Sequence, residues 1–135
     1  MPSVLIVDDD DALRKIYARY LTAEGFKLFE ASNGEQALLK FGNETIDVIL
    51  LDVRMPVANG QILIDSLQHF HPEAKIIVFS CYDQAVQKKM IKTADDYFDK
   101  SEGCQSLLLK IKTILPKIHG LKDTANTKQK KVASR

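Results

Sequence analysis

The chain carries the stretch Val4-Leu5-Ile6-Val7-Asp8-Asp9-Asp10 close to its start, where four apolar residues run directly into acids. A short apolar run with no polar face is typical of a strand that a parallel sheet buries on both sides. Similar runs occupy residues 46–51 and 75–79, and weaker ones occupy 26–31 and 97–98. We therefore predict five strands.

Between these runs, apolar residues recur at spacings of three and four, which predicts helices. Gly25 stops the first helix, Asn33 caps the start of the second and Gly42 ends it, and Pro72 ends the third. The fourth has a short apolar stripe, and Pro116 is expected to distort the last turn of the fifth. The residues predicted to face inward are Leu13, Ile16, Tyr17, Tyr20, Leu21, Ala37, Leu38, Phe41, Ile62, Ile64, Leu67, Phe70, Val86, Met90, Ile91, Leu107, Leu108, Ile111, Leu115 and Ile118.

The strand and helix patterns alternate five times in about 118 residues. This order predicts an α/β fold, in which a doubly wound, five-stranded parallel sheet has helices on both faces and right-handed crossovers. The 135 residues, with 45% hydrophobic and 27% charged side chains, suit one globular domain, which we place at residues 1–120.

Several classes of protein do not fit the composition. No apolar run approaches the roughly 18 residues that a membrane span needs. The N-terminus has no basic segment before an apolar stretch, so we expect no secretory signal and a cytoplasmic location. In that setting Cys81 and Cys104 are expected to be free thiols.

Residues 121–135 form a basic tail, with five Lys or Arg residues against the single acid Asp123. The tail has few aliphatic residues, so we expect it to be disordered. A basic tail can contact nucleic acid or an acidic partner, or can simply keep the chain soluble. A few lysines do not predict specific nucleic-acid binding.

Polar residues that can carry chemistry follow the apolar runs. In an open α/β sheet, ligands bind beyond the carboxyl ends of the strands, and here those ends lead into Asp8, Asp9, Asp52, Ser80 and Lys100. Crowded carboxylates repel one another unless a cation is present, and hard oxygen ligands suit Mg²⁺. The central Asp52 is the best candidate nucleophile toward a phosphoryl group, with Lys100 and Ser80 as its supports.

Simpler structural roles are open for several of these side chains. Asp10 and Asp11 are expected only to complement the dipole of the first helix. Asp8 and Asp9 could also cap the first helix, but a cap does not require two further acids. Taken alone, Asp52 could merely start a turn, and Lys100 could be an ordinary surface lysine. Cys81 is not expected to act as a nucleophile, because no histidine is near it in sequence. The three histidines, His69, His71 and His119, are expected to be solvated.

The whole set resembles a response-regulator receiver domain, the module of two-component signalling typified by the bacterial chemotaxis regulator. The resemblance covers residues 3 to about 118 and implies a flavodoxin-like fold with strand order 2-1-3-4-5. The stretches that carry it are Val4-Leu5-Ile6-Val7-Asp8-Asp9-Asp10, Ala31-Ser32-Asn33-Gly34-Glu35-Gln36-Ala37-Leu38, Asp47 to Met55-Pro56, Asn59-Gly60, Ser80, and Asp96-Tyr97-Phe98-Asp99-Lys100.

The resemblance implies a role for each acid. Asp52 would accept phosphate from a sensor histidine kinase or a phosphotransfer protein. Asp9 and Asp52 would ligate Mg²⁺ directly, Asp8 would do so through water, and the Arg54 carbonyl would complete the protein ligands. Lys100 would grip the phosphoryl group. Such a domain is no enzyme beyond its own phosphotransfer and slow autodephosphorylation.

The resemblance also implies a switch. Ser80 would move to bind the phosphoryl group, and Tyr97 would turn inward as Ser80 leaves its place. The face made of the fourth helix, fifth strand and fifth helix would then change its preference for a downstream protein target. Leu109 and Ile114 on that face are candidates for a homodimer or target contact.

Some positions depart from the family pattern. Ser101 stands where proline is common, so we expect a trans Lys100–Ser101 peptide and consider Ser101 as a cap of the fifth helix. Cys81 replaces a small residue beside the phosphate path, and Thr93 replaces a frequent glycine. Arg54 and Tyr82 occupy positions that tune autodephosphorylation, and we expect them to lengthen the phosphoryl lifetime by screening the attacking water.

Other functional classes stay open at this point. With no second domain after residue 120, the first hypothesis is a stand-alone phosphoacceptor switch. A phosphorylation-independent interaction module is a second hypothesis. A third is a haloacid-dehalogenase-type phosphohydrolase, because Asp8-x-Asp10-x-Ala12-Leu13 is close to that family's opening motif.

Overall fold

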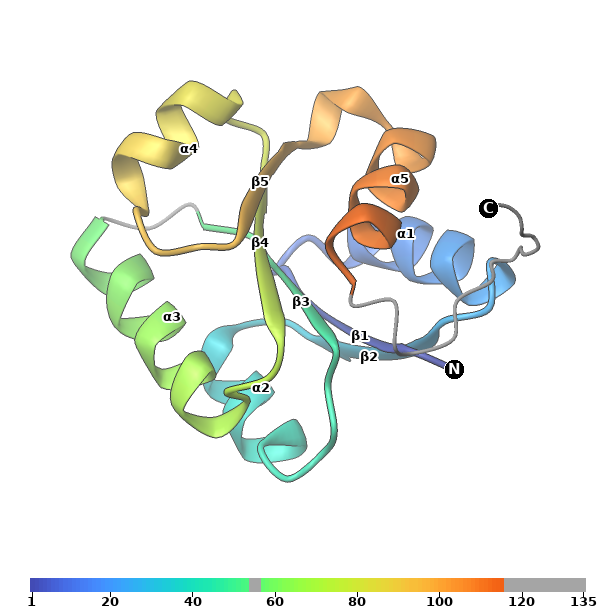
Figure 1. Cartoon of the computed structure of the whole chain (residues 1–135), viewed down its shortest axis with the longest axis horizontal. Helices are drawn as coiled ribbons and strands as arrows, with labels where there is room; N and C mark the ends of the chain where they lie inside the picture. The colour runs from blue at the N-terminus through green and yellow to red at the C-terminus, as the bar shows by residue number, and fades with distance from the viewer. Residues whose placement is uncertain (54–56, 116–135) are drawn as a thin grey trace.

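The computed structural model describes residues 1–53 and 57–115. Alternating strands and helices follow each other through this range (Figure 1). The strands are β1 (Ser3–Val7), β2 (Lys27–Ala31), β3 (Val48–Leu51), β4 (Lys75–Ser80) and β5 (Asp96–Asp99). The helices are α1 (Asp11–Ala23), α2 (Gly34–Phe41), α3 (Val57–Phe70), α4 (Gln84–Met90), the 3₁₀ turn η1 (Lys100–Glu102) and α5 (Cys104–Ile114).

The five strands form one sheet in the order β2-β1-β3-β4-β5, and every pairing is parallel. The predicted fold class and strand order are therefore confirmed. Val7 pairs with Leu51, and Ser80 pairs with Asp99. Because these pairs are in register, the residues that follow them leave the sheet at the same edge.

Alternate residues of each strand enter two separate cores, since strand side chains point to opposite faces. Leu5 and Val7 of β1 pack in the core under α2 and α3, while Val4 and Ile6 pack in the core under α1 and α5. Figure 1 shows α1 and α5 on one side of the sheet and α2, α3 and α4 on the other. Both faces are covered, which explains the unbroken apolar runs.

The helix starts follow the predicted caps. The side chain of Asp10 accepts a hydrogen bond from the Leu13 N–H, and that of Asn33 accepts one from the Gln36 N–H. Asp10 and Asp11 thus have the helix-starting role expected of them. The third strand begins at Val48 rather than at residue 46, and the Asp47 carboxylate before it accepts hydrogen bonds from the N–H and the hydroxyl of Ser3.

Several predictions of burial were wrong. Ile16, Ile62, Phe70 and Val86 are 39–63% exposed. A helix that packs on a sheet with one narrow stripe leaves apolar residues at the margins of that stripe in solvent. His71, expected in solvent, is buried between the end of α3 and the start of β4. Ile91 is fully buried but lies just beyond the end of α4.

Some predictions fall outside the described residues: the Arg54 carbonyl, the Pro116 distortion, Ile118, the solvent exposure of His119 and the tail at 121–135. The side chain of Met90 is likewise not described. Among the helices that are described, none has the length and apolar character required to cross a bilayer. Cys81 and Cys104 are both free thiols, as predicted.

Candidate functional site

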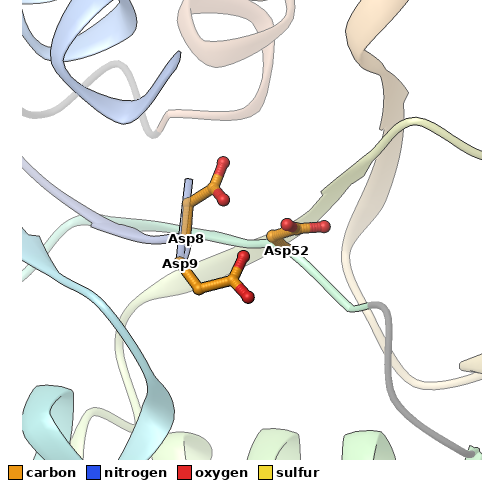
Figure 2. A group of neighbouring side chains, drawn as sticks. All are labelled: Asp8, Asp9 and Asp52. Atoms are coloured by element: carbon orange, nitrogen blue, oxygen red, sulfur yellow. The ribbon is translucent and has the colours of Figure 1, made fainter. Parts of the chain in front are cut away.

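Three carboxylates gather at the carboxyl edge of the sheet. Asp8 and Asp9 follow β1, and Asp52 follows β3, the strand beside it. The peptide N–H of Asp52 donates to the Val7 carbonyl at 2.9 Å, so the two chain segments stay paired up to the acids. Figure 2 shows the three side chains side by side, with Asp9 extending toward Asp52.

The three acids have a geometry that suits a metal ion. Each contributes a carboxylate oxygen, and these oxygens all lie within 4.8 Å of one another. Asp8 is buried and the Asp52 side chain is only 3% exposed, whereas Asp9 is open to solvent. The group therefore has a buried side, formed by Asp8 and Asp52, and a side at Asp9 that is open to solvent.

Lys100 brings a positive charge to the same point. It follows β5, and its Nζ lies 2.7 Å from Asp8 Oδ2 and 3.3 Å from Asp52 Oδ2. Its side chain is 4% exposed. Burial by itself raises the pKa of Asp8, but the hydrogen bonds from Lys100 and from the Asp10 N–H outweigh burial and hold that pKa below its usual value.

The charges of this group do not balance. Three carboxylates face one ammonium, which leaves an excess of negative charge that a divalent cation matches. The pocket beside the acids is also lined by Ser32, Asn33, Gly34 and Leu63 from the β2–α2 connection and α3. The residues present thus fit Mg²⁺, which prefers carboxylate oxygen and water as ligands.

Ser80 and Tyr97 lie on the neighbouring strands β4 and β5. Ser80 ends β4, is 1% exposed and accepts a hydrogen bond from the Tyr82 N–H at 3.4 Å. The Tyr97 ring is turned inward, and its hydroxyl donates to the Ile91 carbonyl at 2.7 Å. Burial raises the pKa of Tyr97. Ser80 thus contacts the connection that precedes α4, and Tyr97 contacts the residue that follows α4.

The structure also describes most of the positions that depart from the family pattern or were expected to tune autodephosphorylation. Cys81 and Tyr82 are exposed on the β4–α4 connection, next to Ser80. The Lys100–Ser101 peptide is trans, as predicted, since the described residues contain no cis peptide. Ser101 does not cap α5: Gly103 precedes that helix, and Ser101 lies inside η1, where its N–H donates to Asp99. Thr93 accepts a hydrogen bond from the Gln61 side chain.

Sequence reasoning missed two polar side chains close to this edge. Arg14 is 8% exposed and donates to the Asp8 carbonyl at 2.7 Å. Gln87 is 1% exposed and donates to the carbonyls of Tyr82 and Phe98. The spacing of Arg14 with Tyr17 and Leu21 places it on the buried stripe of α1, which was the available signal. For Gln87 the sequence offers no comparable signal.

The structure is thus a doubly wound α/β domain with an acid group and a buried lysine at the carboxyl edge of its sheet. The family model of the response regulator receiver domain matches residues 4–112. The chain therefore belongs to the receiver domain family of two-component signalling, whose members are regulatory domains that bind Mg²⁺ at their acidic pocket and interact with sensor histidine kinases and downstream targets.

Individual relatives agree with this membership. A curated cyclic di-GMP phosphodiesterase of Thermotoga maritima is 36% identical over 111 residues, which cover 81% of this chain and 30% of that protein. The transcriptional regulatory protein CpxR of Escherichia coli is 33% identical over 88% of this chain. The chain spans about half the length of CpxR.

Solved structures agree as well. The response regulator TrrA of Thermotoga maritima, crystallised in complex with Mg(2+)-BeF, has a TM-score of 0.73 and 32% identity, covering 85% of this chain and all of that one. The chemotaxis protein CheY4 of Vibrio cholerae has a TM-score of 0.76 and 26% identity over 85% of this chain and 99% of that one.

Proposed function

We propose that this domain is a phosphorylation-dependent switch, which accepts a phosphoryl group on Asp52 in a Mg²⁺-dependent reaction. The observation that carries the proposal is the convergence of Asp8, Asp9, Asp52 and Lys100 from three different strands on one edge. The family and the Mg(2+)-BeF complex of TrrA support it. The phosphoryl donor would be a sensor histidine kinase or a phosphotransfer protein.

The chemistry follows from the positions of the side chains. A carboxylate oxygen of Asp52 forms a bond to phosphorus as the bond between phosphorus and the donor breaks, and the donor leaves with that electron pair. Lys100 lies close enough to Asp52 to oppose the negative charge on the transferred oxygens. Asp8, Asp9, Asp52 and the Arg54 carbonyl would hold Mg²⁺, which supplies further charge neutralisation when bound.

The output of the switch is proposed for the α4-β5-α5 face. Ser80 would bind the phosphoryl group, and the inward Tyr97 would stabilise the packing that follows. Leu109 of α5 is 67% exposed and Val86 of α4 is 39% exposed, so apolar surface is available there for a target or a second copy. The switch is then a shift of population between two packings, biased by one phosphoryl group.

The two other hypotheses have less support. A phosphorylation-independent module does not need the buried lysine and acids, which are costly to bury unless they serve a purpose. A dehalogenase-type hydrolase usually has a flap insertion after its first strand. Here α1 begins at Asp11, directly after the acids.

Intact-mass measurement tests the phosphoacceptor. We expect the protein treated with acetyl phosphate and Mg²⁺ to gain about 80 Da, the mass of one phosphoryl group. Asp52→Asn should gain nothing, because an amide is a poor nucleophile. Asp10→Asn is the matched control, since Asn keeps the α1 cap and should leave the gain intact. An equal gain in Asp52→Asn would place the phosphoacceptor elsewhere.

A further inference from the structure

Arg14 is a buried cation that the phosphoryl chemistry does not use. Its guanidinium makes three polar contacts: Nε donates to Glu30 Oε1 at 3.0 Å, Nη1 lies 2.8 Å from Asp11 Oδ1, and Nη1 donates to the Asp8 carbonyl at 2.7 Å. A buried charge is tolerated only when it is paired. The contacts to Glu30 and Asp11 pair its charge, and the Asp8 carbonyl accepts a hydrogen bond from a further N–H of the guanidinium.

That carbonyl belongs to the peptide group that joins Asp8 to Asp9. The rest of Asp8 is also held: its N–H donates to the Ala31 carbonyl, Oδ1 accepts from the Asp10 N–H, and Oδ2 accepts from Lys100. With the Asp8 side chain fixed in this way, the bond from Arg14 sets the rotation of the peptide that follows. That rotation determines the direction in which the Asp9 side chain leaves the backbone.

Glu30 gives Arg14 its orientation. It lies on β2, and its backbone is paired in the sheet opposite Ile6 of β1. The guanidinium is therefore braced against the sheet on one side and delivers a donor to the Asp8 carbonyl on the other. A planar guanidinium, with several donors in a fixed geometry, can make such a bridge, whereas the single ammonium of lysine cannot make all three contacts in this geometry.

We propose that Arg14 is a positioning residue of the divalent cation site: braced by Glu30, it holds the Asp8–Asp9 peptide so that the Asp9 carboxylate faces Asp52. This inference rests on the proposed function, because it assumes that the three acids bind Mg²⁺. Outer-shell groups that orient metal ligands commonly contribute about 10- to 100-fold in metal affinity.

The positioning role and a purely electrostatic role predict opposite signs. If Arg14 acted only through its charge, its removal would tighten Mg²⁺ binding, because a positive charge near the cation would be gone. If Arg14 positions the Asp8–Asp9 peptide, its removal weakens binding despite that electrostatic gain. The sign of the change in Mg²⁺ affinity therefore separates the two roles.

Titration calorimetry with Mg²⁺ on the unphosphorylated protein measures this sign. We expect Arg14→Met to raise the Mg²⁺ dissociation constant about 10-fold or more. Arg14→Lys, which keeps the charge but not the fork of donors, should also weaken binding. Arg19→Met is the control, because Arg19 is exposed on the same helix. Unchanged or tighter binding in either Arg14 variant overturns the proposal.

A second readout needs no metal. The Asp9 amide belongs to the peptide whose carbonyl accepts from Arg14, so its ¹⁵N chemical shift in the metal-free protein should move in both Arg14 variants and stay in place in Arg19→Met. Thermal unfolding without metal checks that each variant is folded, and Arg14→Lys decides the question if Arg14→Met does not fold. Absence of Mg²⁺ binding by the wild-type chain would instead contradict the proposed function.

Discussion

Lys100 carries its ammonium group into the buried edge of the sheet, where it lies within 3.3 Å of the carboxylates of both Asp8 and Asp52. The ammonium also lies 4.8 Å from the centre of the Phe79 ring. The two carboxylates and the aromatic ring together compensate the free-energy cost of removing the lysine ammonium from water. The same contacts make the two acids depend on Lys100 whenever no metal ion is bound.

Replacing Lys100 by Met should destabilise the metal-free protein by about 3 kcal/mol or more, because two buried carboxylates lose their counter-charge. Urea unfolding with and without excess Mg²⁺ measures the loss, and Mg²⁺ should recover part of it by binding the folded state.

Lys110→Met is the matched control for Lys100→Met. Lys110 pairs with Asp96 at 3.2 Å, but its side chain is 20% exposed. An ion pair near the surface contributes about 1 kcal/mol or less. Equal losses in the free energy of unfolding would show that the buried contacts of Lys100 contribute no more to stability than the partly exposed contact of Lys110.

At the scale of elements, the buried amide of Gln87 links α4 to the sheet. Gln87 Nε2 donates to the Tyr82 carbonyl at 2.6 Å and to the Phe98 carbonyl at 2.8 Å. The first contact holds the connection after Ser80, and the second holds β5 two residues before Lys100. Within the described residues, the buried Gln87 Oε1 has no hydrogen-bond partner, so the Gln87 amide uses its donors but not its acceptor. Elements held by few buried contacts generally open more readily than the core of a domain.

Gln87→Leu should loosen α4 without unfolding the domain, because it leaves two carbonyls without their donor at a cost of about 1–3 kcal/mol. Hydrogen exchange of the α4 amides should become faster, while exchange in β1 should change little.

Gln84→Leu provides the control on the same helix. Among the described residues, the Gln84 side chain donates a hydrogen bond only to the exposed Glu102. Uniform acceleration across the sheet in Gln87→Leu would mean that the amide supports the whole fold and not α4 in particular.

At the scale of the whole molecule, folding is linked to pH through His71. Burial lowers the pKa of His71, so the folded state keeps it neutral where the unfolded chain already binds a proton. The unfolded state then binds more protons below about pH 6.5, and stability falls as the pH drops.

We expect His71→Gln to lose less stability than the wild type between about pH 7.5 and 5.5, on either side of the usual histidine pKa. Urea midpoints at the two pH values measure this difference. His69→Gln, changed at an exposed position two residues away, should behave like the wild type. A wild-type slope in His71→Gln would mean that other groups carry the pH dependence.

The sequence predicted the site residues that follow strands, but it did not predict the buried polar residues that lie on helices or between elements. Asp8, Asp9, Asp52 and Lys100 were found because each follows an apolar run, and parallel strands deliver such residues to a common edge. The burial of Arg14 could have been predicted from its spacing with Tyr17 and Leu21, but its partners could not. Gln87 was missed because its sequence context indicates neither its burial nor its distant partners. His71 was misjudged because it lies between α3 and β4, where the packing of the two elements and no local pattern decides its exposure.

The sequence by itself determined the fold class and the set of acids with their lysine, because apolar period and order along the chain encode these features locally. The strand order was an implication of the family resemblance, which the sheet pairing bears out. Only the tertiary structure decided which polar groups are buried and paired: Lys100 with Asp8 across 92 residues, Tyr97 with the Ile91 carbonyl, and Arg14 with Asp8 and Glu30. Such pairings depend on the register and packing of separate elements, which no single stretch of the chain specifies.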